Sequence, residues 1–195
     1  MKSTSRSGIR HLREWLCRLI GKNSPVKKTK VDRAQTSRSG KLRRRPSARV
    51  FVLDVQQRIL LLKFVFSEGA LAGKVFWCTP GGEVNVDETF ADAARRELFE
   101  ETGLAMTKVG RHLVERNFVM MLPDGEKVLA CERFFLFQTD CRDLSVCNRT
   151  VEEQKVIVEH KWWTAAELIA STDAIFPLNL LEILQVKGLV EPVEV

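Results

Sequence analysis

The feature that most constrains this chain is the stretch from Gly82 to Leu104, where a glycine-containing turn leads into a helix. Pro80-Gly81-Gly82 is expected to stop regular structure and to let the backbone turn tightly. Asp87 is expected to cap a helix over 88–102, and Gly103 is a natural C-terminal stop. The inward stripe of this helix is expected to contain Phe90, Ala94 and Leu98.

Three carboxylates share one side of this predicted helix. Glu97, Glu100 and Glu101 fall within an arc of about 100° when each residue turns by about 100°. Like charges at these spacings repel, so a cation is expected beside them. Oxygen ligands alone favour Mg²⁺ or Mn²⁺ and disfavour zinc. Because glutamates are also common on solvated helix faces, the spacing by itself does not establish a metal site.

The segments around this helix predict a sheet. Apolar runs rich in β-branched and aromatic residues predict strands at 49–55, 59–66, 74–79 and 156–163. Two more extended segments, 109–122 and 127–139, are joined by Pro123-Asp124-Gly125 and predict a hairpin.

Two further helices are expected, at 165–170 and 178–186, and a polar loop is expected over 140–154. Strands and helices intermix without a regular βαβ repeat, so the fold class is α+β, with helices on the faces of a sheet.

Charge divides the chain into two unlike parts. Residues 1–49 contain 16 lysines and arginines against two acidic residues, a local charge of +14. The remaining 146 residues contain 15 basic and 23 acidic side chains, a local charge of −8. The formal net charge of +6 therefore hides an acidic body, and it is no argument for nucleic-acid binding by the whole chain.

The basic extension over 1–44 is expected to be largely disordered, since the segment 22–47 has few large apolar residues. A short amphipathic helix is plausible before it, with apolar residues at Ile9, Leu12, Leu16, Leu19 and Ile20. The extension has three readings: a transit peptide, an anchor to nucleic acid or to an anionic membrane, or a segment without function. No secretory signal is visible, so a cytoplasmic location is expected, or an organelle if the extension is a transit peptide.

The cysteines and the hydropathy exclude other classes. The five cysteines form no CxxC pair, so neither a zinc module nor a disulfide framework is expected. The cysteines are expected to be free thiols. The apolar run over 59–66 is far shorter than the roughly 20 residues of a bilayer span, so a transmembrane protein is not expected.

Every fixed position from Gly82 to Leu104 matches the signature of the Nudix hydrolases, which this chain resembles. The pattern is a glycine, five residues, Glu88, seven residues and then Arg96-Glu97-Leu98-Phe99-Glu100-Glu101-Thr102-Gly103-Leu104. The resemblance extends to flanking segments and covers about 45–185, and it is strongest to bacterial MutT-like members.

This resemblance implies an α/β/α sandwich with a mixed β-sheet in a domain over 45–190. It also implies metal-dependent hydrolysis of a nucleoside diphosphate linked to another moiety, with a small-molecule nucleotide as substrate. Glu97, Glu100 and Glu101 would ligate Mg²⁺ or Mn²⁺, Arg96 and Glu88 would be their ion-paired supports, and Gly82 and Gly103 would serve the backbone bends.

Several roles stay open. Glu97 is the first choice for the general base, with Glu152 and Glu153 as alternatives, and Glu132 could reach the site or pair with a neighbour. Candidate substrate-binding residues are Gly81, Gly82, Arg49 and Arg133.

Elimination favours a nucleoside triphosphate or a nucleotide-sugar-type substrate. The competing function is a nucleotide-binding module recruited to nucleic acid or membrane by the basic extension. A homodimer is possible, because similar domains often pair.

Overall fold

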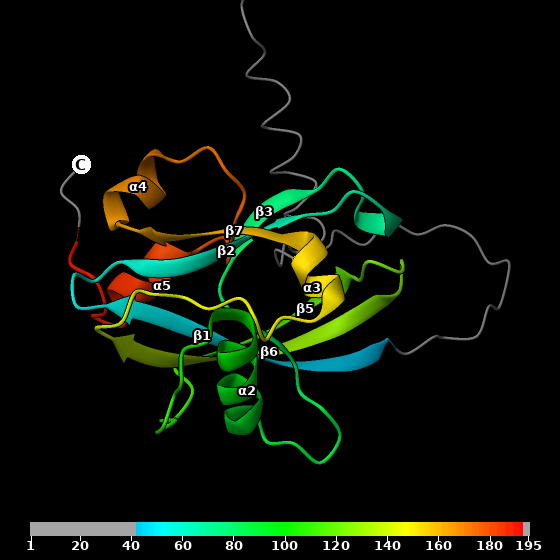
Figure 1. The fold of residues 1–195 in the computed structure, drawn as a ribbon, viewed down its shortest axis with the longest axis horizontal. Coiled ribbons are helices and arrows are strands. Elements are labelled where there is room, and N and C mark those ends of the chain that lie inside the picture. The colour runs from blue at the N-terminus through cyan, green and yellow to red at the C-terminus, as the bar shows by residue number, and fades with distance from the viewer. Residues whose placement is uncertain (1–41, 193–195) are drawn as a thin grey trace, which may run out of the picture.

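The computed structural model describes residues 42–192, which form one eight-stranded sheet with helices packed against it (Figure 1). The predictions for the basic extension, including its short helix, its disorder over 22–41 and its partners, lie outside the described residues. Within residues 42–192, no helix is long and apolar enough to cross a membrane.

The strands form a mixed sheet, as predicted. The path of hydrogen-bonded neighbours is β5-β6-β1-β2-β3-β8, with β4 paired to β1 and β7 paired to β2. The β1–β6 and β3–β8 pairs are parallel and the other pairs are antiparallel. The strands are β1 (Arg43–Asp54), β2 (Ile59–Val65), β3 (Val75–Cys78), β4 (Gly81–Glu83), β5 (Val114–Met121), β6 (Lys127–Thr139), β7 (Ile157–Trp163) and β8 (Ile175–Phe176).

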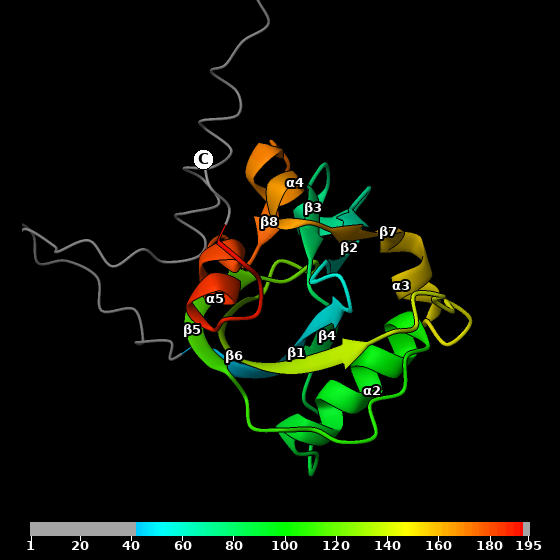
Figure 2. The ribbon, with the colours of Figure 1, turned by 90° about the vertical axis from the view of Figure 1, so that its left-hand side faces the viewer.

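Helices lie on both sides of this sheet, which confirms the expected layers. Figure 2 shows α2 beneath the strands β1 and β6, with α5 away from it. The helices are η1 (Gly69–Leu71), α2 (Phe90–Thr102), α3 (Val151–Val156), α4 (Ala165–Ala170) and α5 (Leu180–Val186).

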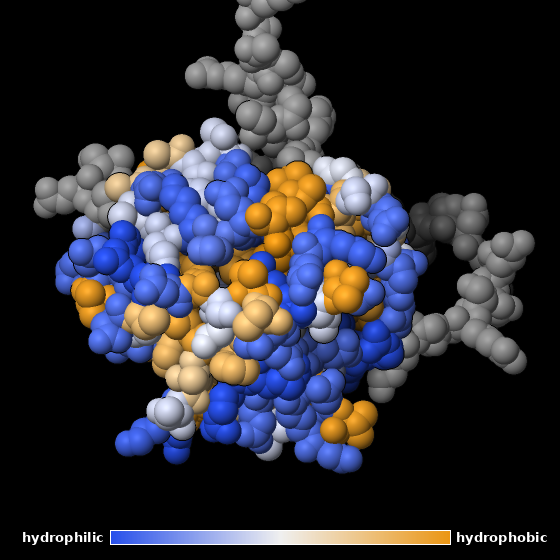
Figure 3. Space-filling view, viewed as in Figure 1, coloured by the Kyte–Doolittle hydropathy of each residue, from blue (hydrophilic) through white to orange (hydrophobic). Residues whose placement is uncertain are grey.

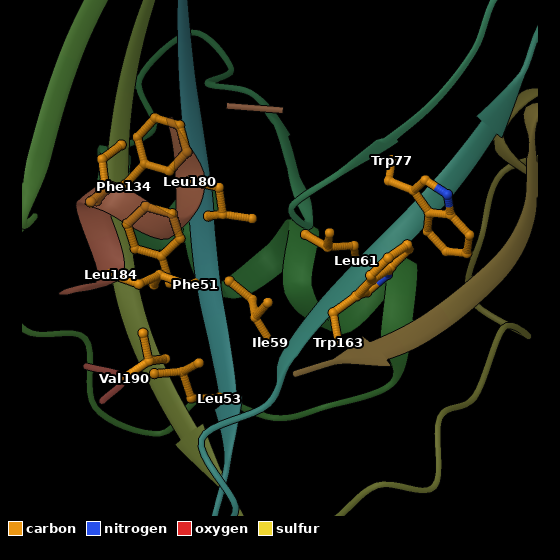
Figure 4. Close-up of a cluster of buried hydrophobic side chains, with 11 residues drawn as sticks. Phe51, Leu53, Ile59, Leu61, Trp77, Phe134, Trp163, Leu180, Leu184 and Val190 are labelled. Atoms are coloured by element: carbon orange, nitrogen blue, oxygen red, sulfur yellow. The ribbon is translucent and has the colours of Figure 1, made fainter. Parts of the chain in front are cut away.

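Alternation along β1 divides the core into two clusters. Val50 and Val52 pack with the α2 residues Ala94 and Leu98, so α2 covers one face of β1. The other face contributes Phe51 and Leu53 to a second cluster. Figure 4 shows this cluster between β1, β2 and α5, with Phe51, Ile59, Leu61, Trp77, Phe134, Trp163, Leu180 and Leu184 among its members.

The beginning of β1 corrects the predicted extent of the extension. Residues 43–47 were expected to be disordered, but they belong to β1 and pair with β6 in parallel. Arg43 forms ion pairs with Glu126 at 2.7 Å and with Glu83 at 3.2 Å, and Arg45 pairs with Glu83 at 3.0 Å. The prediction was wrong because a basic composition without large apolar residues indicates disorder only where the charges have no partners. Here acidic residues from distant segments form ion pairs with the basic residues of the strand.

The entry into α2 also differs from the prediction. Thr89, not Asp87, is the N-cap, and its side chain accepts a hydrogen bond from the backbone of Asp92. Asp87 instead lies in the left-handed region, with φ of 63°. The Gly81–Gly82 segment, expected only as a break, forms β4 by pairing with β1. Gly103 ends α2 with φ of 75°, as predicted.

The predicted loop over 140–154 contains the start of a helix. α3 begins at Val151, after the N-cap Thr150, and β7 follows directly. The two-residue strand β8 was not predicted, because so short a segment has no detectable period. The hairpin of β5 and β6 is confirmed, although β5 begins at Val114 and not at residue 109. The four cysteines among the described residues are free, as expected.

Candidate active site

Three carboxylates from two helices meet at the carboxyl-terminal half of α2. One oxygen each from Glu97, Glu101 and Glu153 lies within 4.8 Å of the others. Glu97 and Glu101 are only 6% and 3% exposed, although both carry an ionisable group. Glu153 belongs to α3 and is half-buried. We refer to these three residues as the carboxylate triad.

Glu101 lies deepest in the triad and is fixed by the turn before β4. Its Oε2 accepts a hydrogen bond of 2.7 Å from the backbone N–H of Gly81. Burial raises the pKa of Glu101 to about 8, and the charges of Glu97 and Glu153 act in the same direction. Without a cation, Glu101 is therefore largely protonated at neutral pH.

Glu97 is held between Arg96 and the glycine turn. Its Oε1 accepts a hydrogen bond of 2.7 Å from Nη1 of Arg96. Burial raises the pKa of Glu97, with Arg96 acting against that shift. A Cβ atom added to Gly82 would lie 2.6 Å from the carboxylate of Glu97, so the absence of a side chain at Gly82 leaves room for this carboxylate.

Arg96 organises the acidic side of α2. Nε and Nη2 donate to the two carboxylate oxygens of Glu88 at 2.8 and 2.9 Å, which is the expected ion pair in a bidentate form. Nη2 also donates to the carbonyl of Glu83, and Nη1 donates to Glu100 at 2.9 Å. The hydrogen bonds from Arg96 lower the pKa of Glu88. One guanidinium thus connects β4, the turn before α2 and the triad.

Glu153 has two roles in the geometry. It closes a capping box at the start of α3, where its Oε2 accepts from the backbone N–H and the hydroxyl of Thr150 at 2.8 and 2.9 Å. Its carboxylate also belongs to the triad. The pattern Thr150-x-x-Glu153 is a sequence signal for a helix start and would have predicted α3.

Arg149 is a buried residue near the triad that the sequence interpretation missed. Its Nε donates to the backbone carbonyl of Glu101 at 2.8 Å, and its Nη1 donates to the carbonyl of Ile157 at 3.2 Å. Gln154 in turn donates to the carbonyl of Arg149. Arg149 thereby joins the end of α2 to both ends of α3, and no local pattern distinguishes it from a solvated loop arginine.

The remaining predicted residues lie in three different places. Glu100 is bound by Arg96 and is not a member of the triad, and Glu152 is exposed. Arg133 contacts Phe90 at the start of α2, with 4.3 Å from its guanidinium carbon to the ring centre, and it pairs with Glu115 at 3.4 Å. It points away from Glu132, because neighbouring residues of a strand face opposite sides of a sheet.

Arg49 and Glu132 lie next to the glycine turn. Nη1 of Arg49 donates to the carbonyl of Gly81 at 2.6 Å, and its Nε pairs with Oε1 of Glu132 at 3.2 Å. Both side chains are largely buried. The structure therefore brings Gly81, Arg49 and Glu132 close to the triad, while Arg133 lies on the sheet face that α2 covers, near the start of that helix.

Substituting Gly82 by alanine should separate catalysis from folding. The added methyl group would displace the carboxylate end of the Glu97 side chain and not the backbone, and Gly82 needs no left-handed conformation. We expect turnover to fall at least about tenfold, with the melting temperature within a few degrees of the native value. Gly110→Ala is the matched control, because nothing lies within 4 Å of the added Cβ there. Full activity of Gly82→Ala in turnover assays would contradict the placement of Glu97.

The donor set of the triad fits a hard divalent cation. Three neighbouring carboxylates shielded from water destabilise one another unless one of them takes up a proton or a positive charge lies between them. Oxygen ligands without thiolate or imidazole suit Mg²⁺ or Mn²⁺. In Figure 3 hydrophilic residues cover the lower part of α2, and apolar residues lie above it and to its left. The arrangement can therefore hold a cation against a glycine turn.

Comparisons with known proteins agree on one family. The family model described as NUDIX domain matches residues 43–182. Phosphatase NudJ from Escherichia coli (strain K12) is 29% identical over 116 residues, which cover 60% of this chain and 69% of NudJ.

Two solved structures share the fold. The MutT protein from Methanosarcina mazei Go1 has a TM-score of 0.56 at 22% identity, covering 77% of this chain and 96% of that chain. The NUDIX domain of Shewanella oneidensis NrtR, complexed with ADP ribose, has a TM-score of 0.54 at 18% identity, covering 76% of this chain and 90% of that chain.

Proposed function

Because the chain belongs to the NUDIX family and is a pyrophosphohydrolase of that family, we propose that it hydrolyses a nucleoside triphosphate or a related nucleotide with Mg²⁺ or Mn²⁺. The family acts on nucleoside diphosphate derivatives, and the proposal adds the metal and the narrower substrate class. The observation that supports the metal is the carboxylate triad of Glu97, Glu101 and Glu153.

The triad also explains how an acidic site accepts an anionic substrate. A pyrophosphate would be repelled by three carboxylates, so charge reversal is needed. Glu97, Glu101 and Glu153 would hold the cation, which when bound supplies Lewis-acid polarisation of the phosphoanhydride and offsets its charge.

The chain's own groups then divide the remaining work. We assign acceptance of the proton from the attacking water to Glu97, since its pKa is raised and Arg96 fixes one of its oxygens. Glu101 is kept in place by the backbone of Gly81 and by Arg149, which binds its carbonyl. Glu88, through Arg96, is a positioning residue for this side of the helix.

A substrate panel with a binding readout tests the proposal. Nucleoside triphosphates, ADP-ribose, dinucleoside polyphosphates and capped RNA would be incubated with Mg²⁺, and phosphate products would be measured with and without EDTA. We expect a nucleoside triphosphate to be cleaved and EDTA to abolish the cleavage. Calorimetry with Mn²⁺ alone should detect binding to the native chain and weaker binding to Glu101→Gln. Turnover that resists EDTA, or no Mn²⁺ binding, would refute the metal-dependent mechanism.

A further inference from the structure

We propose that Arg116 and Glu132 are specificity-determining residues that bind one edge of the substrate's nucleobase, with Arg116 as hydrogen-bond donor and Glu132 as acceptor. This inference rests on the proposed function and deepens it, because it names the part of the nucleotide that the chain distinguishes. Neither the triad nor its supports require Arg116.

A continuous series of contacts leads from the triad to these two residues. Glu101 binds Gly81, Gly81 binds Arg49, and Arg49 pairs with Glu132. Glu132 on β6 lies directly opposite Arg116 on β5, so both side chains leave the same face of the sheet.

The series also sets the distance from the triad. It crosses from β4 through β1 and β6 to β5, which is three strand spacings, or roughly 14 Å. A nucleotide with its phosphates at the triad can therefore extend its base towards Arg116.

Arg116 is a half-buried cation without a hydrogen-bond acceptor in the described part of the chain. Its guanidinium carbon lies 5.3 Å from the ring centre of Phe118. Burial lowers the pKa of Arg116, while Glu132 and Cys78 act in the opposite direction, so these groups share one neighbourhood. The guanidinium nitrogens of Arg116 are not among the buried atoms without a partner, so they remain open to a ligand that supplies hydrogen-bond acceptors.

The neighbouring carboxylate determines what kind of ligand fits. Glu132 is 6% exposed and would repel a second phosphate placed beside Arg116. A nucleobase edge offers acceptors and N–H donors side by side, which complements a guanidinium next to a carboxylate. Guanine, cytosine and uracil each offer three such groups along one edge and adenine offers two, so adenine should be the least favoured base.

Steady-state kinetics with GTP, ATP, CTP and UTP tests this inference. The native enzyme should show at least a tenfold spread in kcat/KM between the best and the worst base. Arg116→Met and Glu132→Gln should raise KM for the best base about tenfold, with a smaller change in kcat, and should reduce the spread to about twofold. Glu132→Gln keeps an acceptor for Arg49, which limits indirect effects on the glycine turn.

Two further variants separate base recognition from simple charge. Glu115→Gln, the control, changes the neighbour that points to the other face of β5, and the base spread should not change. Arg116→Lys keeps the charge but loses the planar donor pair, so it should lose the spread as well. If Arg116→Lys retained native kinetics and Arg116→Met weakened all four nucleotides equally, Arg116 would bind a phosphate and the inference would be wrong.

A binding measurement distinguishes failure of this inference from failure of the proposed function. Calorimetry with the four nucleoside monophosphates in EDTA requires neither metal nor turnover. Base-dependent affinity that Arg116→Met abolishes would support the inference even if no triphosphate were cleaved. Triphosphate cleavage without base preference in either assay would refute the inference and leave the proposed function intact.

Discussion

Replacing Glu101 by glutamine should lower the rate of nucleotide hydrolysis at least about tenfold, which corresponds to about 1.4 kcal/mol of barrier. The substitution removes one charged oxygen ligand from the triad but keeps an acceptor for the N–H of Gly81. The fold should therefore survive: kcat should fall while the melting temperature stays close to that of the native chain. Steady-state rates with saturating Mg²⁺, beside thermal unfolding of the same samples, measure both effects.

Glu100→Gln is the informative comparison for this result. Glu100 precedes Glu101 on α2, but its carboxylate is bound by Arg96 and does not belong to the triad. We expect its loss of rate to be several times smaller than that of Glu101→Gln. Equal losses in the two variants would show that Glu100 also holds the cation and that the triad is incomplete.

The metal-free protein should lose stability as the pH rises from about 5.5 to about 8. Burial raises the pKa of Glu101 to about 8 from its usual 4.5, so the folded state binds this proton more tightly than the unfolded state. The unfolded state then binds fewer protons across this range, and the free energy of unfolding falls with pH. One pKa unit corresponds to about 1.4 kcal/mol, so a loss of roughly 3 kcal/mol is expected over this pH range.

Urea unfolding in EDTA at several pH values measures this effect. The difference between the native chain and Glu101→Gln isolates it, because other groups that titrate in this range contribute equally to both. Addition of Mn²⁺ should restore stability most strongly near pH 8, where the carboxylates are ionised without proton release. A native-minus-variant difference that does not vary with pH would contradict the assignment of Glu101 as a buried acid.

The sequence was sufficient for features that depend on local chemistry. The span of α2 was predicted within two residues because apolar spacing and Gly103 define it. The hairpin of β5 and β6 followed from the turn at Pro123-Asp124-Gly125. The pairing of Arg96 with Glu88 was implied by the resemblance to the Nudix hydrolases, and the structure contains it. These features are set within one helix or one hairpin.

Features that depend on distant pairing were not predicted. Residues 43–47 resemble a basic linker until β6 and Glu83 provide partners. Arg149 acts on backbone carbonyls of Glu101 and Ile157, which no sequence spacing encodes. Glu153, named from the sequence only as an alternative base, lies beside Glu97 and Glu101 because α3 packs near the end of α2. In each case tertiary contact, and not local propensity, decides the outcome.

The capping box of α3 has a thermodynamic consequence. The same carboxylate that satisfies the amide of Thr150 faces Glu97 and Glu101, so opening of α3 also removes one oxygen donor from a bound ion. Local unfolding of α3 and release of a bound ion would therefore be linked equilibria. Ion binding would stabilise the ordered form of α3, and the ordered form would raise the affinity for the ion by the same free energy. Under the proposed metal binding, this six-residue helix with no buried residue of its own would be stabilised by the ion that it helps to hold.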